Sequence, residues 1–234
     1  MESEKELYKI WKKYINKNIY RVTSDEYTKD IIKNGINPKK DPLKKIRPKL
    51  ERLYNLVLDL ENKGYIIILD WYEIKPIGSF VVRVSREDLE HPYVDFTPSW
   101  KDVIKYKKQW KGGAIASNAG KLCKEILKLK LELSKKDISL LTEILEWSKS
   151  KYKYKNKVVV VRGNSKAFET AKFQHHLGKI EPERYWESPY GSFNHFKKVI
   201  NKYGLDRYKP FFKGEKVAHF RVIKSIRPKE IKII

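Results

Sequence analysis

The chain has 234 residues, of which 52 are Lys or Arg and 29 are Asp or Glu, so its formal net charge is +23 and its pI is about 9.8. This excess favours polyanionic partners, nucleic acid above all, because contacts with phosphates release condensed counterions. A hydrophobic content of 41% is enough to bury a core, which excludes a disordered basic tail. A single cysteine, Cys123, excludes an intrachain disulfide framework and a cysteine-based zinc site.

Composition also bears on where the protein works. The N-terminal segment carries Glu2, Glu4 and Glu6 where a signal peptide would be basic, and no run of about 18 apolar residues occurs. We therefore expect a cytoplasmic protein without membrane association. Glutamine, cysteine and methionine are scarce, which is typical of a thermophilic protein that avoids thermolabile residues. A merely lysine-rich surface of such a protein is the alternative explanation of the charge.

The N-terminal part predicts a helix, a strand and a short second helix. Apolar residues at helical spacing predict the first helix over residues 4–17, and residues 19–23 are typical of a strand. Ser24 can cap the next helix, and Gly35 follows its last turn, where glycine commonly ends a helix. A basic, proline-punctuated stretch over residues 36–52 then leads into a third helix.

The middle of the chain changes from strands to helices. Strands are predicted at residues 65–69, 77–84 and 93–96. Ser99 can cap the helix that follows the last of them. Periodic leucines and isoleucines over residues 119–151 predict two helices, the second capped by Asp137 or Ser139. We interpret residues 117–156 as a helical insert.

The C-terminal part returns to mixed elements. The sequence predicts a buried strand at residues 157–161, a helix that runs toward His175, a helix at 193–203 and closing strands at 216–222 and 231–234. Helices and strands do not alternate regularly, so the pattern favours an α+β fold over a doubly wound parallel sheet. We expect residues 1–234 to form a single α+β module with a mixed, mostly antiparallel sheet core.

Three segments resemble the ADP-ribosyltransferase superfamily. Tyr20-Arg21-Val22-Thr23, the following helix and residues 32–38 are similar to the first strand, helix and turn of that superfamily. Residues 96–106 are similar to its strand that ends in a Ser-Thr-Ser-type turn and enters a helix, and residues 220–231 are similar to its final hairpin. The resemblance implies an ADP-ribosyltransferase-like fold for the sheet core.

The resemblance also implies NAD as a cofactor and names its contacts. Arg21 would hold the phosphate or ribose of the nucleotide, and Thr97 and Ser99 would shape the nicotinamide pocket. Enzymes of the superfamily place a catalytic Glu at the head of a late strand, but the alignment puts no carboxylate there, and the nearest one is Glu215. Arg21 and Glu215 are therefore the candidate catalytic residues. The tRNA 2′-phosphotransferases share the fold and handle phosphate with basic residues instead of a Glu.

Two segments interleave lysines with aromatic residues, the composition that lets lysines pair with phosphates while a ring stacks on a base. The predicted nucleic-acid contacts are Lys105, Lys107, Lys108, Trp110, Lys111, Lys151, Tyr152, Lys153, Tyr154 and Lys155. The alternative is that the rings face the core and only the lysines face water. Trp71, Trp100 and Trp147 are predicted to be core residues.

Two other groups of residues resemble catalytic or metal sites in composition. A Mg²⁺-dependent nuclease holds its metal with carboxylates and orients water with a lysine. The same residue types occur at Asp59, Asp70, Glu73 and Lys75. His175-His176 does not predict a metal site, because adjacent side chains of a helix point in different directions. The sequence favours a nucleic-acid-binding protein with an ADP-ribosyltransferase-like core that processes or modifies DNA or RNA. A non-enzymatic nucleic-acid-binding protein and the nuclease are the alternatives.

Overall fold

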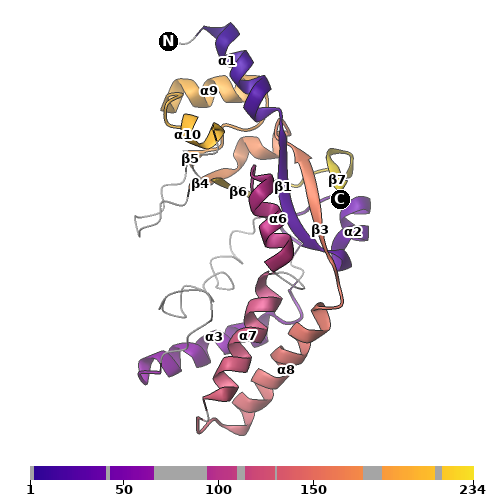
Figure 1. Cartoon of the computed structure of the whole chain (residues 1–234), viewed down its shortest axis with the longest axis vertical. Helices are drawn as coiled ribbons and strands as arrows, with labels where there is room; N and C mark the ends of the chain where they lie inside the picture. Colours follow the sequence, from indigo (N-terminus) through magenta and orange to yellow (C-terminus); the bar gives the residue numbers. More distant parts are fainter. Residues whose placement is uncertain are drawn as a thin grey trace. The chain divides into compact units, whose positions relative to one another are not determined.

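A computed structural model provides the structure of the chain and describes residues 3–40, 43–65, 94–109, 114–129, 131–175, 186–213 and 218–234. These residues group into two compact units. Unit 1 contains residues 1–39, 92–109 and 157–234, and unit 2 contains residues 40–91 and 110–156. Figure 1 labels the elements of both units, which are described separately below.

Unit 1 combines two small sheets with helices. Its helices are α1 (Glu4–Ile10), a π-helical turn (Trp11–Ile15), α2 (Thr28–Asn34), α6 (Trp100–Gln109), α9 (Phe193–Tyr203) and α10 (Lys209–Phe212). Its strands are β1 (Asn18–Ser24), β2 (Val94–Phe96), β3 (Asn156–Arg162), β4 (Lys172–His175), β5 (Trp186–Glu187), β6 (Ala218–Val222) and β7 (Ile231–Ile233). The strands form one sheet of order β1-β3-β7 and another of order β2-β6-β4-β5.

The four-stranded sheet is held by a row of aromatic side chains. Antiparallel pairing places Phe96 opposite Phe220, Phe220 opposite Phe173, and Phe173 opposite Trp186. Phe173 and Phe220 are fully buried, and their ring centroids lie 5.3 Å apart. Alternate residues on a strand point to opposite faces, so the neighbouring row of Asp95, Arg221, Lys172 and Glu187 is polar. This aromatic face fixes the register, because a slip of one residue would bury the charged row.

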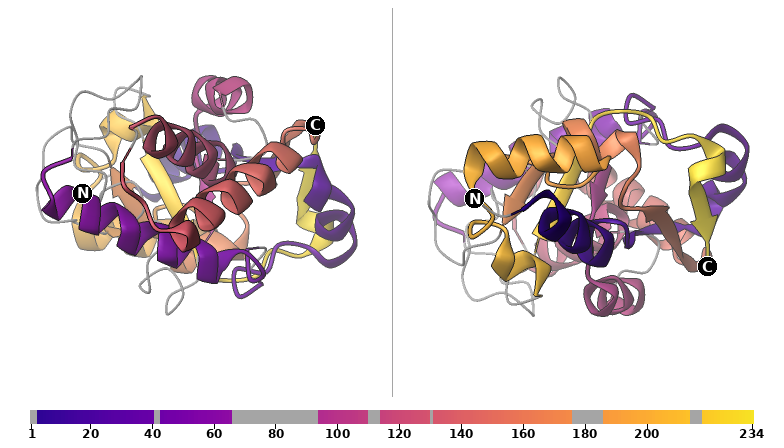
Figure 2. Two further views of the ribbon diagram at one scale, coloured as in Figure 1. Left: turned by 90° about the horizontal axis from the view of Figure 1, so that it is seen from below. Right: turned by 90° about the horizontal axis from the view of Figure 1, so that it is seen from above.

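Helices α1 and α9 pack beside each other in the same unit, as Figure 2 shows in its right-hand view. The rings of Tyr8 and Phe193 meet edge to face with centroids 5.1 Å apart. The Trp11 Nε1 donates a hydrogen bond to the carbonyl of Gly191, just before α9 begins. Ser192 caps α9 by accepting a hydrogen bond from the His195 backbone N–H.

Unit 2 is helical in the residues that the structure describes. It contains α3 (Arg47–Asn62), α7 (Ala114–Lys128) and α8 (Lys135–Lys151), which lie together in the left-hand view of Figure 2. Their core includes Leu53, Val57, Leu122, Ile126 and Ile144, all with side chains no more than 2% exposed. The Ser148 hydroxyl donates to the Ala116 carbonyl, which ties α8 to α7.

The structure confirms the α+β class and the antiparallel pairing, and it corrects two local predictions. The helix expected before His175 is a 3-10 turn (Lys166–Thr170) followed by strand β4. The segment is extended because Phe173 pairs with Phe220 of β6 and so joins the aromatic row of the sheet. The cap of α8 is Ser134 and not Asp137 or Ser139, since the Ser134 hydroxyl accepts from the Asp137 N–H.

The strands expected at 65–69 and 77–84 lie outside the described residues, apart from Tyr65. The single module with an insert at residues 117–156 stays a prediction. Within the part of the chain that the structure describes, no helix has both the length and the apolar character needed to cross a membrane.

Candidate nucleic-acid interface

Helix α6 presents a row of exposed lysines on unit 1. Val103 is buried and packs with Val158 and Val160 of β3, so this side of the helix faces the sheet. Lys101, Lys105 and Lys108 follow at spacings of four and three residues on the other side and are all exposed. Seven residues of helix rise by about 10 Å, so the three ammonium groups form a short positive stripe.

Trp100 is the first residue of α6 and lies at the edge of its sheet-facing side, because Val103 and Ile104 follow it by three and four residues. Its side chain is 45% exposed, so the prediction that Trp100 is a core residue is wrong. The indole packs against the Tyr20 ring in a T-shaped arrangement, with centroids 5.0 Å apart and planes at 63°. The Tyr20 contact supports the indole from one side, while nearly half of its surface is open to solvent. A supported and exposed indole on a lysine-rich helix is the kind of surface on which bases stack in single-strand-binding proteins.

The start of α6 is fixed by the two residues predicted as pocket residues. The Thr97 backbone exchanges two hydrogen bonds of 2.8 Å with Tyr20, which joins the end of β2 to β1. The Thr97 Oγ1 accepts from the Ser99 N–H at 3.2 Å, and the Ser99 hydroxyl accepts from the Asp102 N–H at 3.2 Å. Thr97 and Ser99 therefore position Trp100 through a turn and a helix cap.

Arg21 lies on β1 directly after Tyr20, near the same junction. Its side chain is half-buried. Desolvation by burial lowers the pKa of the Arg21 guanidinium from its ordinary value, and the nearby Asp95 carboxylate acts in the opposite direction. Arg21 thus lies in the middle of β1, next to the residue that pairs with Thr97, and the Asp95 carboxylate acts on its guanidinium.

The second predicted segment, residues 151–155, follows the end of α8 in unit 2. Tyr152 is 39% exposed, and its hydroxyl lies 3.3 Å from the Ser148 hydroxyl. The Lys151 and Lys153 ammonium groups lie over the Tyr154 ring, 5.8 and 5.1 Å from its centroid. Lys155 is exposed. Tyr154 is therefore already engaged by lysines, which leaves Tyr152 as the more accessible ring of this segment.

Several predicted residues lie outside the described part of the chain. These are Glu215, Trp110, Lys111, Trp71, and the Asp70, Glu73 and Lys75 of the nuclease hypothesis. Asp59, the remaining nuclease residue, lies on α3. Of the other predicted contacts, Lys107 is a half-buried residue of α6. Among the residues that the structure describes, no three His, Cys, Asp or Glu side chains gather as they would around a metal ion.

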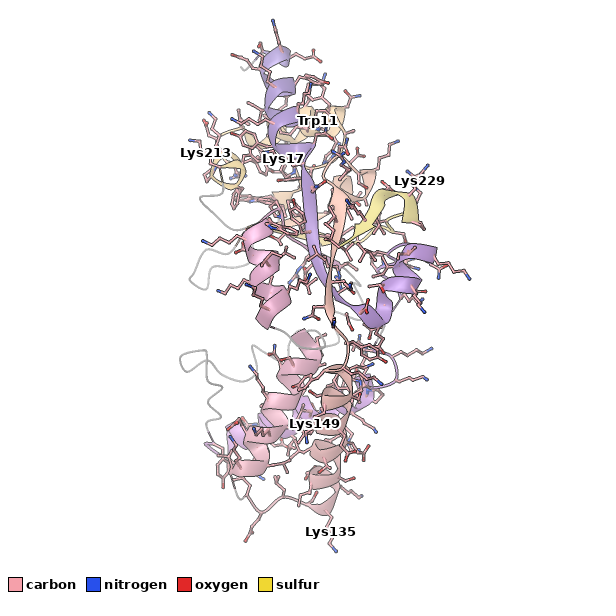
Figure 3. All side chains as sticks on the ribbon, turned by 45° about the vertical axis from the view of Figure 1, so that its right-hand side comes forward. Trp11, Lys17, Lys135, Lys149, Lys213 and Lys229 are labelled. Carbon is pink, nitrogen blue, oxygen red and sulfur yellow. The ribbon has the colours of Figure 1, made fainter. Side chains whose placement is uncertain are left out.

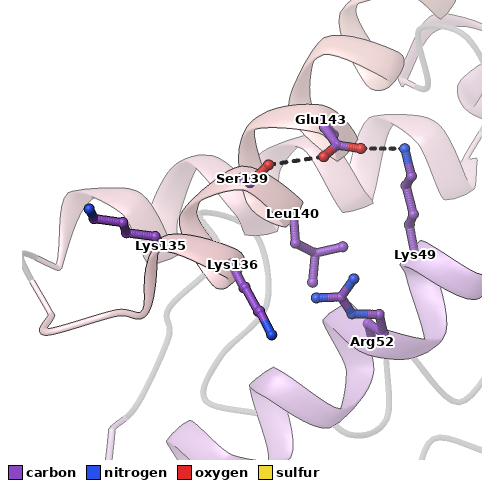
Figure 4. Close-up of a pocket in the computed structure, with 7 residues that line it drawn as sticks. All are labelled: Lys49, Arg52, Lys135, Lys136, Ser139, Leu140 and Glu143. Atoms are coloured by element: carbon purple, nitrogen blue, oxygen red, sulfur yellow. Dashed lines mark hydrogen bonds and ion pairs between the residues drawn. The ribbon is translucent and has the colours of Figure 1, made fainter.

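An open surface pocket that the sequence did not predict, called the α3–α8 cavity below, lies between α3 and α8 in unit 2 and has a volume of about 540 Å³. It is lined by Lys49, Arg52, Lys135, Lys136, Ser139, Leu140 and Glu143, which Figure 4 shows. Closely spaced basic residues on α3 and α8 are the only sequence signal for this site. The signal is weak, because such pairs are frequent in a chain with 52 Lys and Arg residues. Only the packing of α3 on α8 shows that they face one cavity.

Cys123 is not a candidate nucleophile. Its side chain is fully buried in the core of unit 2, and burial raises the pKa of its thiol to about 12. The reactive thiolate is therefore almost absent at neutral pH.

Comparison with known proteins gives no relative from which a function could be transferred. No protein-family model, no curated protein and no solved structure matches the chain.

Proposed function

We propose that this protein binds nucleic acid and that the exposed side of α6 is one of its contact surfaces. Lys101, Lys105 and Lys108 would contact phosphates, and Trp100 would stack on an unpaired base. The net charge of +23 supplies the long-range attraction to a polyanion. Binding of this kind needs no catalytic group, so it holds whether the protein is an enzyme or a binding protein.

The exposed Trp100 is the observation that carries this proposal. Exposed lysines alone are consistent with a merely lysine-rich surface, because lysine is usually at the surface. Exposing nearly half of an indole, in contrast, has an energetic cost in water that stacking on a base would remove. The exposed lysines of the same helix give the phosphates of the same strand a binding partner.

Replacing Trp100 by alanine should weaken binding of a single-stranded oligonucleotide by about tenfold, since stacking on an aromatic ring contributes about 1–3 kcal/mol per base. Fluorescence anisotropy of a labelled oligonucleotide measures the change. Trp100→Phe, which keeps a ring, should retain most of the affinity. Ile32→Ala is the matched control, because Ile32 is 62% exposed on α2 and apolar but cannot stack. Equal affinity of Trp100→Ala and wild type would contradict the role of α6.

A second candidate function is an NAD-dependent transferase with an ADP-ribosyltransferase-like fold that acts on nucleic acid. The β1–β2 junction supports it, because Tyr20 pairs with Thr97 and so brings Arg21 close to the turn that contains Thr97 and Ser99. In such an enzyme Arg21 would anchor the NAD phosphate, and Glu215 would be the candidate catalytic carboxylate.

On this second hypothesis, Arg21→Lys should weaken NAD binding by about tenfold, because an ammonium cannot reproduce the planar, bidentate guanidinium contact. Isothermal titration calorimetry with NAD measures the effect. Arg162→Lys is the control, since Arg162 is exposed at the end of β3 in the same unit. A wild-type protein that binds no NAD would refute the transferase hypothesis and leave the nucleic-acid proposal intact.

A further inference from the structure

The cavity between α3 and α8 is positively charged. Four cationic side chains and one carboxylate line it, so its formal charge is +3. In Figure 4, Arg52 of α3 and Lys136 of α8 extend toward one another across the space between the helices. These cations come from two separate helices and converge on one volume, unlike the α6 stripe, which runs along a single helix.

The carboxylate in the cavity is already occupied. Glu143 forms an ion pair with Lys49 and accepts a hydrogen bond of 3.0 Å from the Ser139 hydroxyl. The hydrogen bond from Lys49 lowers the pKa of Glu143 most, with further lowering by Ser139 and by the charge of Arg52. Glu143 therefore stays ionised and holds Lys49 at the wall of the cavity. Within the described residues, the side chains of Lys135 and Lys136 form no hydrogen bond or ion pair.

The position of these lysines on α8 also favours an anion. Lys135 and Lys136 are the first two residues of this 17-residue helix, where the unsatisfied N–H groups already carry partial positive charge. Cations are unfavourable there, and the Asp137 carboxylate is the only acidic group of the first turn. A bound anion would offset the repulsion among the lysines and the helix end.

We propose that this cavity binds the terminal phosphate of a nucleic-acid strand, a proposal that rests on the nucleic-acid binding proposed above. A terminal phosphate monoester carries a charge of about −1.5 to −2 at pH 7 and three acceptor oxygens, whereas each internal phosphodiester carries a single charge. Converging cations around one volume match a group of high charge density. The guanidinium of Arg52 can bind two phosphate oxygens at once, and Lys136 can contact the third.

The test compares two oligonucleotides of one sequence, one with a 5′-phosphate and one with a 5′-hydroxyl, as competitors of a 3′-labelled strand in an anisotropy assay. A second pair with 3′-phosphate and 3′-hydroxyl ends covers the other terminus. The phosphorylated strand of one pair should bind wild-type protein about tenfold more tightly, equivalent to about 1.4 kcal/mol. Arg52→Gln and Lys136→Met should abolish this difference. Circular dichroism of each variant checks that α3 and α8 remain folded.

Lys149→Met is the matched control. It removes the same charge from the same helix, but Lys149 is exposed near the other end of α8, as Figure 3 shows, and does not line the cavity. This variant should keep the tenfold preference. Arg52→Lys should retain only part of it, because the charge remains while the bidentate contact is lost.

Other outcomes would overturn the proposal in distinguishable ways. Equal affinity of wild-type protein for phosphorylated and hydroxyl ends would overturn the terminal-phosphate site while leaving nucleic-acid binding intact. A preference that persists in Arg52→Gln and Lys136→Met would place end recognition elsewhere. Calorimetry with inorganic phosphate adds a further arm: phosphate that binds wild type but not Lys136→Met, without any preference between strand ends, would indicate a free phosphate ligand. Failure of every strand to compete at low salt would overturn both proposals.

Discussion

Raising the salt concentration from 50 to 200 mM should weaken binding of nucleic acid by about 100- to 500-fold. If about five phosphates are neutralised, the slope of log K against log salt is about −3.5 for a single strand and −4.5 for a duplex. The excess of 23 positive charges favours several simultaneous phosphate contacts with an extended strand. Anisotropy titrations at four or five salt concentrations give the slope.

A matched pair of variants tests whether α6 supplies some of these contacts. Replacing both Lys105 and Lys108 by glutamine should reduce the slope by about two, since each phosphate-contacting lysine contributes about one. The control replaces Lys29 and Lys33, which are also exposed and share one side of a helix at a spacing of four residues, but on α2. Both variants lose two charges, so only a local contact distinguishes them. Binding that does not depend on salt would rule out recognition through phosphates.

The elements that could be predicted from sequence are those with local signals. A capping residue next to a periodic apolar run is such a signal. It marks the boundaries of the second helical segment at Ser24 and Gly35, the start of α6 at Ser99, and the helix at residues 193–203. Strand β4 had no such signal. Its four residues form a strand because β6 and β5 lie on either side and the buried Phe173 completes an aromatic row. These partners are distant in sequence, so local propensity could not reveal them.

In the candidate site, too, features with a local sequence signal could be predicted and features that depend on distant contacts could not. The sequence predicted the lysines of α6, because basic residues are countable, but it assigned Trp100 to the core. Helical spacing alone does not show which residues at the edge of an apolar stripe are covered, and Val103 and Ile104 suffice to bury α6 against the sheet. The α3–α8 cavity could not be predicted either. The basic residues that α3 contributes lie 83 or more positions before those of α8, and the two pairs converge only through the packing of the helices.

Gly35→Ala should lower the free energy of unfolding by about 3–5 kcal/mol, a large part of the 5–15 kcal/mol typical of a domain. Gly35 has φ 77° and ψ −165°, a region that residues with a Cβ rarely adopt, at a cost of about 1–3 kcal/mol. A Cβ there would also lie 2.1 Å from the Ile226 carbonyl oxygen. That oxygen accepts the Ile36 N–H at 2.9 Å, so moving it weakens the bridge that joins the end of α2 to the C-terminal segment.

Gly204→Ala separates the two contributions. Gly204 follows α9 with φ 81° and ψ 144°, so an alanine there meets nearly the same backbone strain, but among the described residues no atom lies within 4 Å of the added Cβ. We expect this variant to lose only about 1–3 kcal/mol, the backbone cost alone. Urea denaturation followed by circular dichroism measures both. If the two variants lose equal stability, the contact with Ile226 contributes nothing, and the 2.1 Å approach relaxes without breaking the bridge. A larger loss for Gly35→Ala would show that the C-terminal segment is held against α2 by a contact that only glycine permits.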